Sequence, residues 1–306
     1  MSVNLNNIDT EKRNHNTRNI DKLDTLGIVS LINSEDKKVA ESIEANLPAI
    51  AAAIDAIYLR IKSGGRLVYI GAGTSGRLGV LDSAECPPTF GVEDGVVTAL
   101  IAGGETAFVR AVEGAEDNEA LGKSDLCGMG FAAGDALVGI AASGRTPYVK
   151  GALAYAQDIG ALTIALSCTK NSEIAKFADI DIAVQPGAEV ITGSTRMKSG
   201  TAQKMVLNML STVTMVKLGK TYGNLMVDVK ATNQKLIARA INIVCQATGV
   251  TESEALAALN LCGFSAKNAV LMILANVDSK TAQDALDKFE GRIYLALNHL
   301  NERNKG

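Results

Sequence analysis

Histidine is almost absent from this 306-residue chain, which contains only His15 and His299. A Ser-His-Asp triad, a Cys-His pair or a multi-histidine metal site needs histidine beside its other catalytic groups or ligands. Two histidines in the terminal segments do not meet that need. The sequence therefore predicts no metal site, and it leaves acid–base chemistry to carboxylate, Tyr, Lys or Cys side chains.

The chain also lacks an excess of charge, a long apolar run and paired cysteines. Thirty Lys and Arg against 33 Asp and Glu give a net charge of −3, so no overall positive field holds nucleic acid or an anionic membrane. No apolar run approaches the roughly 20 residues of a membrane span. The five cysteines are widely spaced, which is typical of reduced, mostly buried thiols. We expect a cytoplasmic protein without nucleic-acid or membrane partners.

The distribution of apolar residues predicts an α/β fold. Helical spacing over residues 28–61 indicates two or three leading helices, one of them starting at Ser34-Glu35-Asp36. Short apolar runs separated by Gly-rich turns and amphipathic segments then indicate a parallel sheet with helices on both faces. The five predicted strands cover residues 67–70, 96–101, 136–140, 162–167 and 180–184.

The remainder of the chain reads as helical. A helix over about 194–217 closes the sheet domain, and a small bundle follows, in which Thr251 and Glu254 fit a capping box. The predicted bundle helices cover residues 232–247, 251–260, 265–276 and 279–299. We divide the chain into an N-terminal tail with helices that pack on the sheet domain (1–58), the sheet domain (59–228) and a C-terminal helical, UBA-like domain (229–306).

A glycine-rich loop follows the first predicted strand. Its spacing, Gly71-x-Gly73-x-x-Gly76, fits the dinucleotide fingerprint, but that fingerprint also needs an acidic residue after the second strand. The chain has Ala102-Gly103-Gly104 there, so we predict no nucleotide cofactor. Thr74 and Ser75 instead place two hydroxyls at a helix start, which suits one compact phosphate. A plain strand-to-helix turn with a serine cap is the alternative.

Two further loops carry hydroxyls ahead of predicted helices. Ser143 and Thr146 precede Pro147, which sets the first turn of a helix, so they lie at a second anion-attracting terminus. Arg145 between them either contacts the phosphate or is solvated. The third loop, residues 187–204, contains Ser194, for which helix capping is an equal explanation. The first two loops should meet at the carboxyl edge of the sheet.

The candidate acid–base residues are glutamates. Glu85 lies just before Pro87-Pro88, which should end the helix, and a carboxyl group at a helix C-terminus suits a general acid. An exposed helix-end glutamate is the alternative. Glu113 and Glu116 are three residues apart and would share a helix face, where like charges favour a ligand between them or a solvated surface with Arg110.

Taken together, these motifs resemble those of the N-acetylmuramic acid 6-phosphate etherase family. The resemblance covers nearly the whole chain, and the segment 187–204 is its most specific part, being similar also to the glucokinase regulatory proteins. It implies a sugar isomerase (SIS) fold, a three-layer αβα sandwich with N-terminal helices and a C-terminal helical bundle. It also implies a homodimer that uses neither metal nor nucleotide.

The resemblance implies cleavage of the D-lactyl ether of a sugar phosphate by elimination and then hydration. By motif match, Glu85 is the expected acid for the departing lactate and Glu116 the expected base at C2. A sugar-phosphate aldose–ketose isomerase or a non-catalytic sugar-phosphate sensor are the alternatives. The expected substrate- and phosphate-binding residues are Thr74, Ser75, Glu113, Ser143, Thr146 and Ser194.

Overall fold

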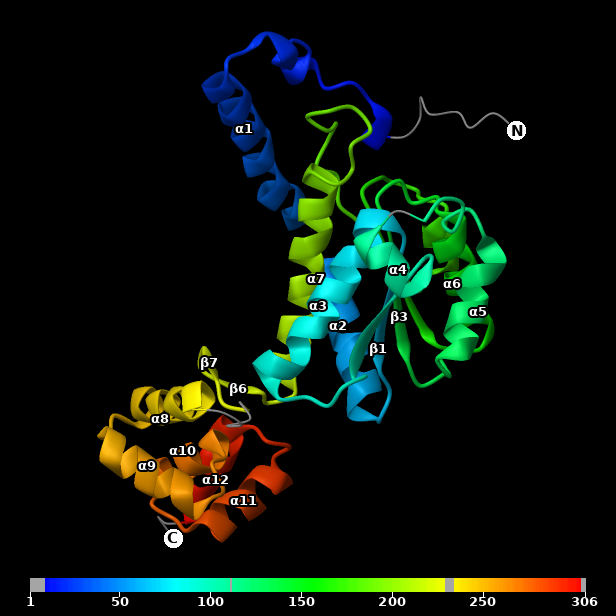
Figure 1. Cartoon of the computed structure of the whole chain (residues 1–306). Coiled ribbons are helices and arrows are strands. Elements are labelled where there is room, and N and C mark those ends of the chain that lie inside the picture. The colour runs from blue at the N-terminus through cyan, green and yellow to red at the C-terminus, as the bar shows by residue number, and fades with distance from the viewer. Residues whose placement is uncertain (1–8, 111, 229–233, 304–306) are drawn as a thin grey trace. The chain divides into compact units, whose positions relative to one another are not determined.

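The computed structural model describes residues 9–110, 112–228 and 234–303 (Figure 1). The chain forms two compact units. The first consists of residues 1–84 and 95–211, and the second of residues 85–94 and 212–306.

The first unit is built on a five-stranded parallel sheet, as predicted. Its strands are β1 (Leu67–Gly71), β2 (Val97–Ile101), β3 (Ala136–Ala141), β4 (Leu162–Ser167) and β5 (Ile180–Ala183). Their order is β2-β1-β3-β4-β5, so the chain leaves β1 in one direction and returns on its other side at β3. In a parallel sheet, ligands bind at such a switch point, outside the carboxyl ends of the strands.

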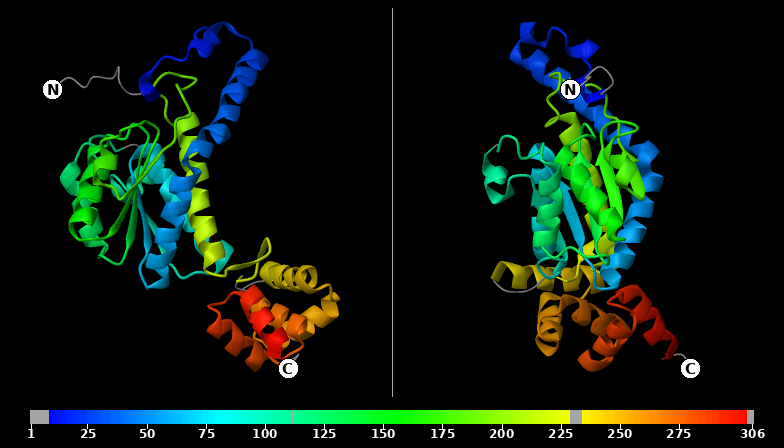
Figure 2. Two further views of the ribbon diagram at one scale, coloured as in Figure 1. Left: turned by 180° about the vertical axis from the view of Figure 1, so that it is seen from behind. Right: turned by 90° about the vertical axis from the view of Figure 1, so that its right-hand side faces the viewer.

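Helices cover both faces of this sheet (Figures 1 and 2). Because side chains alternate along a strand, Val68 and Ile70 pack with α6 residues such as Leu153, whereas Tyr69 donates its hydroxyl proton to Asp82 of α3 at 2.9 Å. The helices that follow the strands are α3 (Gly73–Phe90), α4 (Gly104–Val109), α5 (Glu119–Gly128), α6 (Pro147–Asp158), η6 (Ile174–Phe177) and α7 (Lys198–Lys217). The three-layer architecture predicted from the alternating pattern is confirmed.

Over its described residues, the N-terminal segment contains four short 3-10 turns and two long helices. These are η2 (Asp9–Glu11), η3 (His15–Thr17), η4 (Ile20–Lys22), α1 (Thr25–Ile43), η5 (Glu44–Asn46) and α2 (Leu47–Lys62). The predicted helix start at Ser34 is wrong, because α1 begins at Thr25, where the Asp24 carboxylate accepts the Gly27 N–H at 2.8 Å. Glu35 lies inside the helix and is buried.

The stretch Thr25–Lys62 is long and apolar enough to span a membrane by length and composition. Its second half, α2, buries residues such as Ile50, Ile54 and Ile57 and packs against β1, β4 and β5. A core helix of a sheet domain meets the same criterion, so this stretch is weak evidence for a span.

The second unit contains a small hairpin, β6 (Thr221–Tyr222) and β7 (Leu225–Met226), and five helices among its described residues. They are α8 (Gln234–Thr248), α9 (Glu252–Leu261), α10 (Ala266–Ala275), α11 (Ser279–Lys288) and α12 (Ile293–Arg303). The capping box of Thr251 and Glu254 is confirmed. The single helix predicted over 279–299 is wrong, because Glu290 and Gly291 adopt left-handed φ angles of 54° and 75° between α11 and α12.

Two other expectations fail. Pro87 and Pro88 do not end α3, which runs to Phe90 and closes with the Gly91 N–H on the Pro87 carbonyl at 2.9 Å. Each proline removes one helical N–H but leaves its carbonyl available. The cysteines are free, as expected, but only Cys86 and Cys168 of the five are buried.

Candidate active site

The loops after β1 and β3 meet at the switch point of the sheet, as predicted from their positions. β1 pairs with β3 in parallel, with Gly71 opposite Ile140, so both loops leave the same edge. The first loop leads into α3 and the second into α6. The hydroxyls of Thr74, Ser75, Ser143 and Thr146 are therefore brought together at two helix starts, where backbone N–H groups attract an anion.

The first loop requires glycine because two parts of its backbone approach each other closely. A Cβ on Gly71 would lie 2.7 Å from the Gly76 nitrogen, and one on Gly76 would lie 2.6 Å from the Gly71 carbonyl oxygen. Gly73 has a left-handed φ of 54° at the first residue of α3. This tight turn lets Ser75, which is buried, donate its hydroxyl proton to Gln203 Oε1 of α7 at 2.9 Å.

The second loop leaves its hydroxyls available. Thr146 is the N-cap residue of α6, but its side chain makes no capping hydrogen bond. Gly144, with a φ of 67°, packs so closely on Ser172 that a Cβ would lie 2.3 Å from the Ser172 Cβ. Thr146 and the half-buried Ser143 therefore lie beside the α6 N-terminus, where their hydroxyls are available to donate hydrogen bonds to a ligand oxygen.

The third loop is anchored by buried carboxylates. Glu189, which is fully buried, accepts the N–H groups of Lys198 and Ser199, each at 2.9 Å, and so caps α7. Lys198 Nζ lies 2.9 Å from Glu35 Oε2 and donates to the Ala188 carbonyl at 3.0 Å. Burial alone would raise the pKa of Glu35, but hydrogen bonds from Lys38, Lys198, Asn16 and Asn14 lower it to about 2.

The same carboxylate holds the N-terminal segment on this loop. Asn14 Nδ2 donates to Glu35 Oε2 at 2.9 Å and to the Ala188 carbonyl at 3.2 Å, and the Thr17 hydroxyl donates to the Val190 carbonyl at 2.8 Å. Both segments thereby reach the switch point, one with Glu11 and the other with Thr195.

A cavity of about 570 Å³ lies between these loops. It contains the predicted residues Thr74, Ser75, Glu116, Ser143 and Thr146, together with Glu11, Asp117, Arg145 and Thr195. A second cavity of about 210 Å³ shares Ala72, Gly73 and Glu116 with the first and contains the predicted Glu113. The predicted helix face shared by Glu113 and Glu116 is wrong, because both lie in the loop between α4 and α5. Hydroxyls for a phosphate and a carboxylate for proton transfer therefore line one connected space.

Two predicted residues lie outside both cavities. Ser194 is not among their lining residues, although its neighbour Thr195 is. Glu85 is exposed on α3, eleven residues after Thr74, which corresponds to roughly 16 Å along a helix. It does not line either cavity.

Sequence comparison identifies the family. An N-acetylmuramic acid 6-phosphate etherase of Clostridium beijerinckii is 56% identical over 302 residues, which are 99% of this chain and 99% of its own. One of Serratia proteamaculans is 57% identical over 295 residues, covering 96% of this chain and 99% of its own. The chain belongs to the N-acetylmuramic acid 6-phosphate etherase family. The resemblance seen in the motifs is thereby confirmed.

The domains of this etherase-family chain match three described families. Residues 49–157 match the N-terminal SIS domain of glucokinase regulatory protein, residues 129–213 the SIS domain, and residues 223–265 the C-terminal lid domain of glucokinase regulatory protein. A structure of an E. coli CFT073 protein has a TM-score of 0.50 at 18% identity, covering 66% of this chain and 97% of that chain. A phosphoheptose isomerase from Francisella tularensis has a TM-score of 0.50 at 21% identity, covering 63% and 100%. The SIS fold is confirmed.

Several residues of the etherase-family site had no separate prediction. Glu11 and Thr195 come from segments far apart in the sequence, and Gln203 was noted only as part of the third loop. Arg145, whose two interpretations were equal, lines the larger cavity although the residue as a whole is exposed. A glutamate in an Asn-rich N-terminal segment gives no local signal of a site. Only the pairing of remote segments reveals it.

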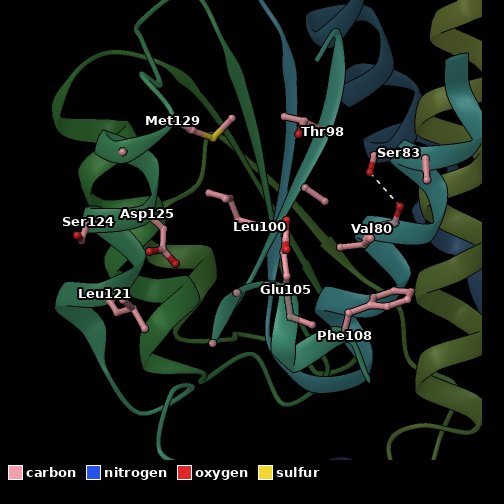
Figure 3. Close-up of a pocket in the computed structure, with 16 residues that line it drawn as sticks. Val80, Ser83, Thr98, Leu100, Glu105, Phe108, Leu121, Ser124, Asp125 and Met129 are labelled. Carbon is pink, nitrogen blue, oxygen red and sulfur yellow. Dashed lines mark hydrogen bonds between the residues drawn. The ribbon is translucent and has the colours of Figure 1, made fainter. Parts of the chain in front are cut away.

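A larger cavity, of about 1060 Å³, lies elsewhere (Figure 3). It opens against the edge strand β2, with Val80 and Ser83 from α3 on one side and Leu121 and Asp125 from α5 on the other. None of the predicted site residues lines it. Among the described residues, no group of three or more His, Cys, Asp or Glu is placed to hold a metal ion.

Proposed function

We propose that this chain cleaves the D-lactyl ether of N-acetylmuramic acid 6-phosphate, giving N-acetylglucosamine 6-phosphate and D-lactate in amino-sugar recycling. The observation that carries the proposal is one cavity that joins four hydroxyls at two helix starts to Glu116, in a chain 56% identical to an etherase over nearly its full length. Its five cysteines are free, which agrees with a reducing cytoplasm.

The phosphate binds where the two helix starts meet. Thr74 and Ser75 lie in the first turn of α3, and Ser143 and Thr146 precede α6. The hydroxyl protons of Thr74, Ser143 and Thr146 and backbone N–H groups at two helix N-termini stabilise a dianion without a basic surface, while Ser75 holds the first loop in place through its bond to Gln203. This cradle fixes the sugar so that its other carbons face the carboxylates of the cavity.

Glu116 acts as the base and Glu85 as the acid. In the open-chain sugar the C1 aldehyde acidifies the C2 proton, which the Glu116 carboxylate removes. The C3–O bond then breaks, and the ether oxygen takes a proton from Glu85 and leaves as D-lactate. Water adds at C3 of the unsaturated aldehyde while C2 regains a proton, so the sequence is balanced without any oxidant, reductant or cofactor.

Glu85 reaches the reaction from a second copy of the chain. Within one chain it lies roughly 16 Å along α3 from Thr74 and lines neither cavity. Its side chain is exposed and so is available to a partner. We therefore propose a homodimer in which the Glu116 of one protomer works with the partner's Glu85.

Mixed dimers test this arrangement. Glu85→Gln and Glu116→Gln are each expected to be inactive alone. Co-refolded in equal amounts, they should regain about a quarter of the wild-type activity, because half of the dimers are mixed and each mixed dimer has one intact site. Absence of recovery in a verified mixed dimer would place both glutamates in one protomer.

The activity itself is tested by D-lactate release. The wild-type chain should release one D-lactate per N-acetylmuramic acid 6-phosphate consumed. An aldose–ketose isomerase would instead interconvert N-acetylglucosamine 6-phosphate and a ketose phosphate, and a sensor would bind the sugar phosphate without turnover. Either of those results in place of lactate release rejects the etherase proposal.

A further inference from the structure

The smaller cavity beside Glu116 has no role in the mechanism above. Its volume is about 210 Å³, enough for about seven water molecules at ~30 Å³ each. It shares Ala72, Gly73 and Glu116 with the larger cavity of the site, so a substrate bound there can extend a substituent into it. We call this smaller cavity the annex.

The lining of the annex combines small apolar groups with charged ones. Ala102, Ala107 and Val112 provide the apolar groups, and Arg77 and Glu113 join Glu116 as the charged ones. Val112 is held against the loop after β2, since a Cβ on Gly103 would lie 2.9 Å from the Val112 Cβ. A ligand group that matches this lining has a methyl end and a polar end.

Arg77 is fixed in place before any ligand binds. Its Nε donates to the Phe108 carbonyl at 2.9 Å and its Nη2 to the Ala107 carbonyl at 2.8 Å. These bonds use two of the five guanidinium N–H groups. No other acceptor among the described residues is bonded to this guanidinium, so the remaining donors are available at low entropic cost.

We propose that the annex binds the acetamido group at C2 of the substrate and so selects N-acetylated sugar phosphates. This inference rests on the proposed function. The amide carbonyl accepts a hydrogen bond from Arg77, the amide N–H donates to a glutamate carboxylate, and the methyl group contacts Val112 and the alanines. The acetamido nitrogen is bonded to C2, the carbon from which Glu116 removes a proton. Filling the annex therefore brings the C2 proton to its base.

Charge distinguishes this group from the other substituents of the sugar. Glu113 and Glu116 line the annex together with Arg77, so two carboxylates and one guanidinium face the same cavity. A lactyl carboxylate or a phosphate in the annex would add a further negative charge to this set, whereas a neutral amide would not. Both faces of an amide, the acceptor and the donor, find complementary groups there.

Binding of two sugars that differ at C2 tests the proposal. Calorimetry with N-acetylglucosamine 6-phosphate and glucose 6-phosphate should give a preference of at least about tenfold for the acetylated sugar in the wild type. Arg77→Gln should reduce this preference to about twofold or less, because the amide acceptor loses its partner. Arg110→Gln, which removes the same charge from an exposed residue outside both cavities, should leave the preference unchanged.

A second variant separates recognition from local structure, since Arg77 also holds the α4 carbonyls. Val112→Phe leaves those bonds intact and fills the annex from a residue that is 40% exposed. It should weaken binding of the acetylated sugar and spare glucose 6-phosphate. If both variants keep the wild-type preference, or weaken the two sugars equally, the annex does not bind the acetamido group.

The lactyl group is the remaining alternative occupant. N-acetylmuramic acid 6-phosphate is bound in the Glu85→Gln background, which prevents turnover without altering the annex lining. The affinity lost in Arg77→Gln is compared for the two ligands. If N-acetylmuramic acid 6-phosphate loses more affinity than N-acetylglucosamine 6-phosphate, the proposal is overturned in favour of a lactyl site. D-lactate release by the wild type is scored separately, so a failure of the etherase function and a failure of the annex are distinguishable.

Discussion

Replacement of Lys198 by Met tests the ion pair that anchors the third loop. The Lys198 and Glu35 side chains are 2% and 4% exposed and lie 2.9 Å apart. Removing one partner of a buried pair costs about 3–5 kcal/mol in general, because the remaining charge stays desolvated. Glu35 keeps hydrogen bonds from Lys38, Asn14 and Asn16, so we expect the lower end, about 3 kcal/mol.

Urea unfolding followed by circular dichroism measures this loss. Lys176→Met is the matched control, because Lys176 pairs with Glu173 at the surface, where the two side chains are 62% and 47% exposed, and it should cost less than about 1 kcal/mol. The double variant Glu35→Gln/Lys198→Met should lose less stability than Lys198→Met alone, since no buried charge is left unpaired. Equal losses for Lys198→Met and Lys176→Met would refute the account of this ion pair.

The loss should also depend on pH. The pKa of Glu35 is lowered to about 2, below its ordinary value of 4.5, so its contribution to stability is present above pH 4.5 and disappears as the pH falls toward 2. Without Lys198 the pKa of Glu35 rises, and the carboxyl group is protonated sooner. The difference between the variant and the wild type should therefore shrink as the pH falls from about 7 to about 4. A difference that stays constant over this range contradicts the assignment.

Three other substitutions have definite expected results. Glu116→Gln should abolish lactate release while calorimetry still detects N-acetylglucosamine 6-phosphate; appreciable turnover removes Glu116 as the base. Ser75→Ala should weaken that ligand about tenfold, because a buried hydroxyl at the phosphate cradle is lost, and unchanged affinity counts against the cradle. Tyr148→Phe should lower the free energy of unfolding by about 1 kcal/mol, since its hydroxyl donates to Asp125 at 2.7 Å. Wild-type stability would show that bond to be unimportant.

Local sequence patterns were sufficient for the sheet and for most of the cavity. Short apolar runs predict the strands because a strand that is buried on both faces carries apolar side chains at nearly every position. The hydroxyl-rich loops were predictable because glycines at 71, 73 and 76 and Pro147 mark the starts of helices. Parallel topology then brings the two loops to one edge.

The failures have two physical causes, which are competing local signals and contacts between distant segments. Ser34-Glu35-Asp36 looks like a helix start, yet α1 begins at Thr25, where Asp24 caps it, so Glu35 lies in the helix interior. Glu11 lines the cavity in a segment that Asn14 and Thr17 hold on the third loop, and no spacing in the sequence encodes that approach. Glu85 was placed at a helix end by its prolines, but α3 continues past them.

Isotope labelling of the products tests the central claim most directly. The chain is incubated with N-acetylmuramic acid 6-phosphate in ¹⁸O-labelled water, and both products are examined by mass spectrometry. Elimination followed by hydration predicts label at the C3 oxygen of N-acetylglucosamine 6-phosphate and an unlabelled hydroxyl oxygen in D-lactate. Label in the lactate hydroxyl with an unlabelled C3 oxygen, or no release of lactate, would contradict the account.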